Sequence, residues 1–309
     1  MIIKNFENQE QEWDDFIKHS FNGTVYHTRK FINYHPKNRF VDKSIMIYDD
    51  NILVCVIPVC LNNDKYFSHL GTTYGGPVII KSYFKIEKLK KIIDLIFEYY
   101  DNKLEMRIAN DIYFNNSQSS LIYLLQTKLY LKLELSWYIT NFNIDNISNK
   151  FNRRHLLNIK KDKSILVFIT DKIDDYIDFY KILENTLKNK HNTKPTHTLE
   201  EFLILKDIVN HKLCIVKNTD IIAGIYFIEV TKDKYYAFYI TKNYKLENNY
   251  TTSCLLYVIE YFMNCIKPNL IDFGISTENK GDILNIGLSK FKEDSMTGIS
   301  SYRYMFITK

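Results

Sequence analysis

The sequence predicts an α/β fold of two successive units, each a mixed sheet flanked by helices. The first observation is a weak internal repeat. "MIYDDNILVCVIPV" (46–59) aligns without gaps with "IVKNTDIIAGIYFI" (215–228), and each reads as a strand, a polar turn and a second strand. The second observation is that an amphipathic helix and a buried strand follow each hairpin, at 88–109 and at 252–276. Two units in the same order indicate duplication of an α/β architecture.

The hydrophobic periodicity places elements in each half. In the first half it predicts helices at 10–19 and 85–100, a hairpin at 44–61, and strands at 65–70 and 104–109. In the second half it predicts helices at 174–190 and 252–266, and strands at 212–217, 221–231, 234–241 and in "LIDFGIS" (270–276). Another helix follows Thr198, because Glu201 three residues later completes a capping box. The polar stretch "DNISNKFN" places a boundary near residue 150, which gives predicted domains of 1–150 and 151–309.

Composition and charge are those of an ordinary soluble globular chain. Of the 309 residues, 46% are hydrophobic and 25% are charged, and the formal net charge is +5. This small positive excess does not predict DNA binding, which needs basic residues concentrated on one face. No apolar run reaches the roughly 18 residues of a membrane span, and the N-terminus lacks the apolar core of a signal peptide. We therefore expect a cytoplasmic protein.

The cysteines predict neither a metal site nor a disulfide framework. There are five, and no two of them form a CxxC pair. In a cytoplasmic protein such cysteines are reduced, and we expect these to be buried thiols. The sequence makes no prediction of an oligomeric state.

Six local segments resemble the double-domain branch of the GCN5-related N-acetyltransferases (GNAT). They span nearly the whole chain in order: "FNGTVYHT", "SHLGTTYGGPV", "FNRRHLLNIKK", "KHNTKPTHTLEEF", "LIDFGIST" and "LNIGLSKFKE". That branch includes the Fem-type aminoacyltransferases of peptidoglycan synthesis and sugar-nucleotide N-acyltransferases of the anthrose-pathway type. The resemblance implies two tandem GNAT-like domains that transfer an acyl group to an amine. We expect residues 1–150 to form the acceptor side and residues 151–309 to form the acyl-donor side.

The expected acyl donor is inferred from the lack of a coiled-coil insertion. Fem-type enzymes take the acyl group from aminoacyl-tRNA, and many carry a long coiled-coil insertion in the second domain. This chain has no sustained heptad pattern and a small net charge. We therefore expect a coenzyme A thioester as co-substrate, no metal, and the amine of a nucleotide-linked amino sugar as acceptor, for surface polysaccharide synthesis. The alternatives are a Fem-like transfer from aminoacyl-tRNA to a peptidoglycan precursor, and a non-catalytic binding protein of the same fold.

The glycine-rich segment "SHLGTTYGGPVII" (68–80) supplies the predicted catalytic residues. His69 titrates near neutrality and stands where a strand gives way to a turn, so we predict it as the base that deprotonates the amine. Ser68 and Tyr74 are predicted to bind substrate hydroxyls or to donate a proton. Gly75 and Gly76 are predicted to allow a positive φ, to let a ligand approach the backbone closely, or both. The alternative for His69 is a ring hydrogen-bonded to backbone at a strand end.

Five further residues are predicted to bind substrate, and structural alternatives compete with these roles. His27 follows the first helix, His197 stands beside a helix N-cap where free amides attract anions, and Tyr239 lies on a predicted strand. By resemblance to the Fem-type enzymes, Arg154 contacts a substrate phosphate and Lys292 steadies developing negative charge. The alternatives are an exposed loop histidine for His27, a structural cap for His197, and solvated helical side chains for Arg154 and Lys292.

The strand at 234–241 is of the type that, in the GNAT fold, splays from the next strand and leaves a gap for pantetheine. The helix expected to begin near Thr251 would then present its N-terminus to the donor pyrophosphate. Its first residues, "NNYTTSC", include no glycine-rich loop of the usual kind, so the position of the donor phosphates stays open. Asp272 is predicted either to orient a partner or to pair with a local cation.

Overall fold

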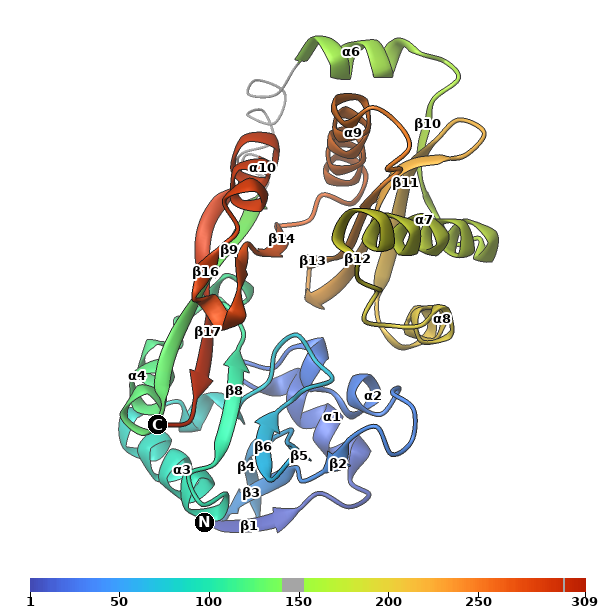
Figure 1. Ribbon diagram of the computed structural model, residues 1–309. Coiled ribbons are helices and arrows are strands. Elements are labelled where there is room, and N and C mark those ends of the chain that lie inside the picture. Colours follow the sequence, from blue (N-terminus) through green and yellow to red (C-terminus); the bar gives the residue numbers. More distant parts are fainter. Residues whose placement is uncertain (141–152, 297) are drawn as a thin grey trace. The chain divides into compact units, whose positions relative to one another are not determined.

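The computed structural model describes residues 1–140, 153–296 and 298–309, and it divides into two compact units (Figure 1). The first unit comprises Met1–Leu135, Thr277–Leu284 and Tyr302–Lys309, and the second comprises Ser136–Ser276 and Asn285–Ser301. The predicted boundary near residue 150 lies outside the described residues. No single cut of the chain separates the units, because the chain returns twice to the first unit after building most of the second.

The first unit holds an antiparallel sheet of order β1-β3-β4-β7 and a further set of strands of order β2-β5-β6-β8-β17. The strands are β1 (Ile2–Asn5), β2 (Val41–Asp42), β3 (Ile45–Asp49), β4 (Ile52–Ile57), β5 (Cys60–Asn62), β6 (Lys65–Ser68), β7 (Val78–Ile79), β8 (Leu104–Ile108) and the end of β17 (Ile299–Ile307). The helices are α1 (Glu10–His19), η1 (Val25–His27), α2 (Arg29–Ile32), η2 (Lys81–Tyr83), α3 (Ile86–Tyr99), η3 (Asp111–Tyr113) and α4 (Ser119–Lys128). The short pair β15 (Thr277–Glu278) and β16 (Ile283–Leu284), joined by η5 (Asn279–Gly281), also belongs here.

Helices cover both faces of the β1-β3-β4-β7 sheet, so its central strands are apolar without alternation. Along β3, Ile45 and Ile47 face the core that α3 and α4 complete, while Met46 faces α1. The residues that α3 buries recur at a spacing of three to four from Leu89 to Ile96, which is the stripe of an amphipathic helix. Burying one such isoleucine fully contributes about 1.5–3 kcal/mol.

The strands of the second unit follow the order β10-β11-β12-β13-β14-β9. Neighbours are antiparallel except β13 and β14, which are parallel. The strands are β9 (Tyr130–Thr140, in this unit from Ser136 onward), β10 (Leu166–Thr170), β11 (His211–Lys217), β12 (Ile221–Thr231), β13 (Lys234–Lys242) and β14 (Leu270–Ile275). The helices are α6 (Arg153–Lys161), α7 (Ile173–His191), α8 (Leu199–Ile208), α9 (Asn248–Ile266) and α10 (Ile286–Met296).

Helices also cover both faces of this second sheet, and Figure 1 shows α7 lying across its strands. On one face, α9 packs its apolar side chains against those of β11, β12 and β14. On the other face, Tyr176 of α7 and Phe202 of α8 pack their rings against Tyr226 of β12. Large aromatic rings therefore fill the α7 side of the sheet.

Local patterns located several elements correctly. The two hairpins of the internal repeat form as the antiparallel pairs β3–β4 and β11–β12. The predicted helix at 10–19 and the predicted strand at 221–231 have the observed bounds, and the capping box of Thr198 and Glu201 is present. Several other boundaries differ by one residue. Larger differences are that the hairpin predicted at 44–61 ends at Ile57, the strand predicted at 65–70 ends at Ser68, and the helix expected near Thr251 begins at Asn248.

The cysteines follow the prediction with one exception. Cys55, Cys60, Cys214 and Cys254 are buried free thiols, whereas Cys265 is exposed because it falls outside the buried stripe of α9. Among the described residues, no group of three or more His, Cys, Asp or Glu side chains is placed to hold a metal ion.

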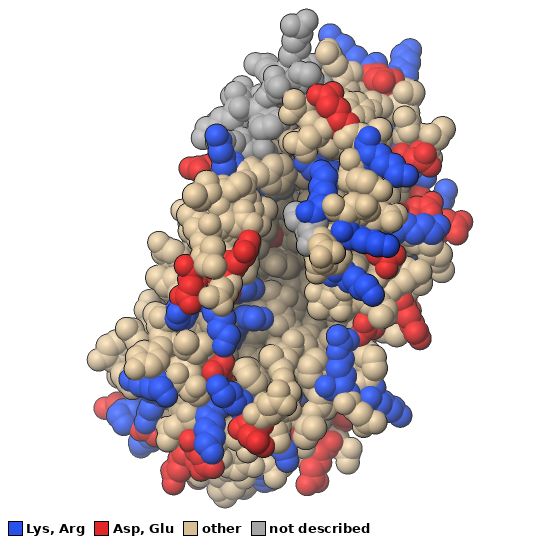
Figure 2. Space-filling view, in the orientation of Figure 1, with Lys and Arg blue, Asp and Glu red and all other residues tan. Residues whose placement is uncertain are grey.

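Two properties concern which partners the protein could bind: the apolar character of its helices and the distribution of its charged side chains. None of the described helices combines the length and the apolar character that crossing a membrane requires. On the face shown in Figure 2, lysines and arginines are interspersed with acidic side chains rather than gathered into one basic patch.

Candidate active site

Strands β13 and β14 pair over only part of their length. The paired residues are Lys234 with Leu270, Tyr235 with Ile271 and Tyr236 with Asp272. β13 continues to Lys242 and stays paired with β12 on its other side, while β14 continues to Ile275, which pairs with Ser136 of β9. Beyond Tyr236 the facing edges of the two strands therefore separate. Among the described residues, no strand pairs with the side of residues 237–242 that faces away from β12. Such an edge carries backbone donors and acceptors that suit an extended ligand.

A β-bulge turns one aromatic side chain of β13 to the other face of the sheet. The pairing with β12 skips Phe238, which is therefore an extra residue on β13. Tyr235 and Ala237 point into the core under α9, and regular alternation would send Tyr239 there as well. The extra residue turns Tyr239 to the opposite face instead, where its ring meets Phe202 of α8 and its hydroxyl meets His197.

Tyr239 and His197 form a hydrogen-bonded pair in which His197 is buried and Tyr239 is half-buried. The Tyr239 hydroxyl lies 2.7 Å from Nδ1 of His197, and the backbone N–H of His197 donates to the same hydroxyl at 3.3 Å. Burial raises the pKa of Tyr239 far above its usual range, so the hydroxyl keeps its proton. Two residues predicted separately as substrate-binding are therefore brought together.

The β14 side of the opening also carries a bulge. The register between β14 and β9 shifts between Asp272 and Ile275, and Gly274 between them has a φ of +73°. The fully buried Asp272 carboxylate accepts from the Ser136 hydroxyl at 3.1 Å and from the backbone N–H of Gly274 at 2.7 Å. A Cβ at position 274 would lie 2.7 Å from the Tyr236 hydroxyl, so both the φ and the space require glycine.

Lys292 of α10 is buried at this bulge. Its ammonium donates to the carbonyl oxygens of Gly274 at 2.9 Å and of Ile275 at 2.7 Å. The alternative of a solvated helical lysine is therefore wrong. The hydroxyls of Ser276, the residue after Ile275, and of Ser289, one helical turn before Lys292, are buried and lack a hydrogen-bond partner among the described residues. This region can therefore accommodate further hydrogen bonds.

The end of β13 lies against the start of α9. The Lys242 ammonium donates to Thr252 Oγ1 at 2.7 Å and to Asn248 Oδ1 at 2.9 Å, and it lies 5.2 Å from the centre of the Phe291 ring. Burial, with the nearby charge of Lys190, lowers the pKa of Lys242 to about 8. A lysine and polar side chains thus stand at the helix start where the sequence lacks the glycine-rich loop.

The glycine-rich segment of the first unit packs against the protein itself. Ser68 Oγ donates to the Pro58 carbonyl at 2.5 Å and accepts from the backbone N–H of Gly76 at 2.7 Å. A Cβ at Gly75 would lie 2.2 Å from the Ser68 carbonyl oxygen, and one at Gly76, where φ is +90°, would lie 2.2 Å from Ile108. The predicted close approach at these glycines exists, but protein atoms occupy the space rather than a ligand.

The two histidines predicted in the first unit are buried. Nδ1 of His69 accepts from the backbone N–H of Gly71 at 3.0 Å. Nδ1 of His27 accepts from the backbone N–H of Thr24 at 3.1 Å, and its Nε2 donates to the Gly75 carbonyl at 3.1 Å. Burial lowers the pKa of each ring to about 4. A base with so low a pKa accepts a proton weakly at neutral pH, so the structure favours structural roles for both.

The remaining predicted residues divide between the units. Tyr74 is almost fully buried and meets the rings of Tyr26 and Tyr113 edge-on, which places it in an aromatic core. Arg154 belongs to α6, and its side chain lies outside what the structure describes. The predicted residues that lie beside the strand opening are therefore His197, Tyr239, Asp272 and Lys292.

Four residues of the site were missed from the sequence: Ser136, Phe238, Lys242 and Gly274. Two of them had a signal. "LKLELSW" (131–137) alternates as a half-buried strand does, and a glycine inside the strand pattern "LIDFGIS" marks a bulge. Phe238 and Lys242 had none, because the bulge depends on the register with β12 and the contacts of Lys242 come from α9.

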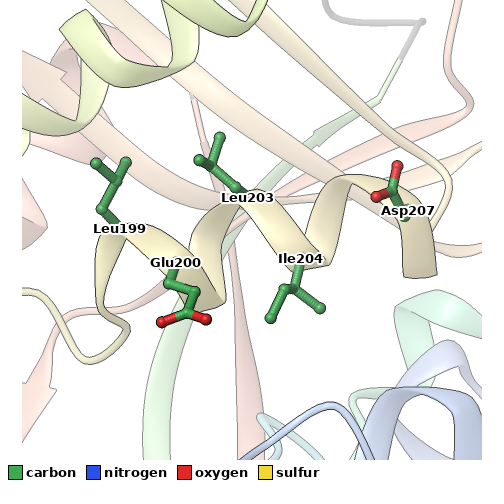
Figure 3. Close-up of a pocket in the computed structure, with 5 residues that line it drawn as sticks. All are labelled: Leu199, Glu200, Leu203, Ile204 and Asp207. Atoms are coloured by element: carbon green, nitrogen blue, oxygen red, sulfur yellow. The ribbon is translucent and has the colours of Figure 1, made fainter.

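A separate open cavity of about 520 Å³ runs along α8 (Figure 3). It is lined by Leu199, Glu200, Leu203, Ile204 and Asp207. Leu199 and Leu203 point to one side of the helix, and Glu200 and Ile204 point to the other. The lining has two carboxylates and no cation, which does not suit a phosphorylated ligand, so we place the candidate site at the opening between β13 and β14.

Comparison with known proteins identifies the fold. No protein-family model matches the sequence, and no curated protein matches it in sequence. The structure is similar to that of FemX, with 13% identity, a TM-score of 0.66 and coverage of 98% of this chain and 97% of that chain. It is similar to L-PGS from Bacillus licheniformis, with 10% identity, a TM-score of 0.64 and coverage of 99% and 93%. It is also similar to a tandem GNAT protein from the clavulanic acid biosynthesis pathway, with 5% identity, a TM-score of 0.60 and coverage of 100% and 98%.

These comparisons confirm the predicted fold class. The chain has the fold of double-domain GNAT-like proteins, with mixed sheets flanked by helices. At such low identities the similarity concerns the fold and not the substrate.

Proposed function

We propose that the chain is an N-acyltransferase that moves an acyl group from a coenzyme A thioester to the amine of a nucleotide-linked amino sugar. We propose that this reaction serves surface polysaccharide synthesis. The observation that supports acyl transfer is the opening between β13 and β14, where one edge of residues 237–242 has no strand partner among the described residues. An extended pantetheine arm carries amide groups that can hydrogen-bond to such an edge as a strand does. We therefore assign the donor to the second unit.

The reaction needs three things from the site. The amine nitrogen attacks the thioester carbon and negative charge collects on the carbonyl oxygen. The C–S bond then breaks, the nitrogen gives up one proton to become an amide, and the leaving thiolate takes up one proton. Backbone N–H groups beside the Phe238 bulge are suited to hold the oxyanion. The buried charge of Lys292 adds electrostatic stabilisation on the β14 side, because charges interact strongly where water is excluded. His197 and Tyr239 form a polar wall for the substrate.

The assignment of the acceptor rests on family resemblance. The first unit is proposed as the acceptor side, but its predicted residues His27, Ser68 and His69 are hydrogen-bonded within the protein. The nucleotide and the amino sugar are therefore proposed as a class of acceptor and not from contacts in this unit.

A Fem-like aminoacyl transfer is the second candidate, and one observation favours it. FemX is matched over 97% of its own length. A protein of that name therefore has this fold without a long additional arm. The absence of a coiled-coil insertion consequently does not separate a coenzyme A donor from an aminoacyl-tRNA donor.

A thiol-release assay tests the proposal. Purified protein is given acetyl-CoA or 3-hydroxybutyryl-CoA with a panel of dTDP- and UDP-linked amino sugars, and free coenzyme A is measured. We expect release that depends on both substrates. Consumption of charged tRNA in the presence of a peptidoglycan precursor, with no thiol release, would establish the Fem-like reaction instead. Binding of neither donor would favour a non-catalytic protein of this fold.

A further inference from the structure

The backbone of β14 departs from a regular strand where the opening begins. In a regular strand, consecutive carbonyl oxygens point to opposite neighbours, so a single ammonium does not reach both. Lys292 donates to the consecutive carbonyls of Gly274 and Ile275, at 2.9 and 2.7 Å. The φ of +73° at Gly274 breaks the alternation and brings the two oxygens to one donor.

The backbone N–H in the same stretch is also bonded by a side chain. The N–H of Gly274 donates to the Asp272 carboxylate at 2.7 Å, and Ser136 Oγ donates to that same carboxylate at 3.1 Å. The last pair between β13 and β14 joins Tyr236 to Asp272, directly before these bonds. Side chains therefore bond an N–H and two carbonyl groups of β14 directly beyond its last pair with β13.

We propose that Lys292, acting with Asp272 and Gly274, is a positioning residue that keeps β13 and β14 apart and so preserves the opening. Its importance for donor binding rests on the proposed function, but its effect on the strands does not. Without the ammonium, the buried carbonyl oxygen of Gly274 and the part-buried one of Ile275 would lose this donor, which is costly. The open edge of β13 has N–H groups that would satisfy them if the sheet closed.

Amide hydrogen exchange on the full-length protein without ligand tests this. Lys292→Met removes the donors while keeping a chain of similar length, and Lys290→Met makes the same change on the exposed face of α10. We expect exchange of residues 237–242 to slow about tenfold in Lys292→Met, because new strand pairs protect the amides, and to stay unchanged in Lys290→Met. Lys292→Arg, which keeps the charge and the donors, should retain the exchange of the unaltered protein.

Two results would overturn the proposal. Unchanged exchange at 237–242 would show that Lys292 does not hold the strands apart, and faster exchange throughout the second unit would show that it only stabilises the fold. If Lys292→Met does not fold, Asp272→Ala decides the question, because it frees the N–H of Gly274 for pairing with β13. Slower exchange at 237–242 then supports the proposal, and unchanged or faster exchange contradicts it.

Calorimetric titration with coenzyme A separates this inference from the proposed function. We expect Lys292→Met to weaken coenzyme A binding about tenfold or more, and Lys290→Met to leave it unchanged. If the unaltered protein binds no coenzyme A while Lys292→Met still slows exchange at 237–242, the donor proposal fails and the positioning role stands. If coenzyme A binds and Lys292→Met alters neither binding nor exchange, the positioning role fails and the donor proposal stands.

Discussion

At the scale of single residues, the space beside a glycine determines whether replacing it with alanine lowers or raises the free energy of unfolding. A Cβ at Gly75 would lie 2.2 Å from the backbone oxygen of Ser68, whereas one at Gly287, in α10, meets nothing nearer than Asn285 Oδ1 at 3.7 Å. We expect Gly75→Ala to lower the free energy of unfolding by about 1–3 kcal/mol through overpacking. Gly287→Ala should raise it by up to about 1 kcal/mol, because alanine favours the helix. Urea unfolding of both variants checks this, and equal effects would contradict it.

The buried histidines predict a loss of stability in acid. The unfolded chain takes up a proton on each ring below its ordinary pKa of about 6.5, whereas folded His27 and His69 do so only near pH 4. Their contribution is therefore complete above about pH 6.5 and is lost as the pH falls towards 4. At pH 5 each ring should lower the free energy of unfolding by roughly 2 kcal/mol relative to pH 7.

The variant His69→Gln isolates one ring, because glutamine does not titrate. Its free energy of unfolding should decline less between pH 7 and pH 5 than that of the unaltered protein, by roughly 2 kcal/mol. Urea unfolding at the two pH values measures the difference. The same decline in both proteins would show that His69 is not held neutral by the fold.

At the scale of elements, the start of α8 is stabilised by side chains that the sequence already identifies. Thr198 Oγ1 accepts from the backbone N–H of Glu201 at 3.2 Å, and the Glu201 carboxylate accepts from the backbone N–H of Thr198 at 2.9 Å. We expect Thr198→Ala to lower the free energy of unfolding by about 1 kcal/mol. Glu201→Gln should have a smaller effect, because glutamine also completes a capping box. Thermal unfolding compares them, and a larger loss in Glu201→Gln would contradict the capping role.

Strand β13 has one feature, its β-bulge, that the local sequence pattern does not predict. The segment "KYYAFYITK" alternates well enough to predict β13, and its bounds are nearly those expected. The pattern does not show that Phe238 is an extra residue, because that follows from the register with β12. One skipped residue reverses which face Tyr239 occupies and therefore decides that it meets His197.

At the scale of the whole molecule, the C-terminal strand completes the first unit. Arg303 Nε donates to the Glu134 carboxylate at 2.7 Å, with both side chains buried. We expect Arg303→Met to lower the free energy of unfolding by about 3–5 kcal/mol, because it leaves a buried carboxylate uncompensated. Lys65→Met is the control, since the Lys65 ammonium is exposed and lies 3.9 Å from Glu105, so its loss should cost about 1 kcal/mol or less.

Differential scanning calorimetry of the two variants tests whether the buried ion pair of Arg303 and Glu134 stabilises the first unit. The transition of Arg303→Met should shift to lower temperature by several times the shift of Lys65→Met. Equal shifts would show that the buried pair does not stabilise the unit more than an exposed one.

The sequence by itself determined the local elements and their order. Hydrophobic periodicity and capping depend on residues a few positions apart, so they located α1, β12 and the start of α8, and the repeat indicated two α/β units. Only the tertiary structure decided which candidates meet. His197 finds Tyr239 across 42 positions, and Lys292 finds the carbonyls of β14 across 17 and 18. The backbone of Ser68 fills the space beside Gly75, which is likewise a contact that the sequence pattern does not show. Burial and hydrogen-bond partners are set by packing between distant segments, and no local pattern records them.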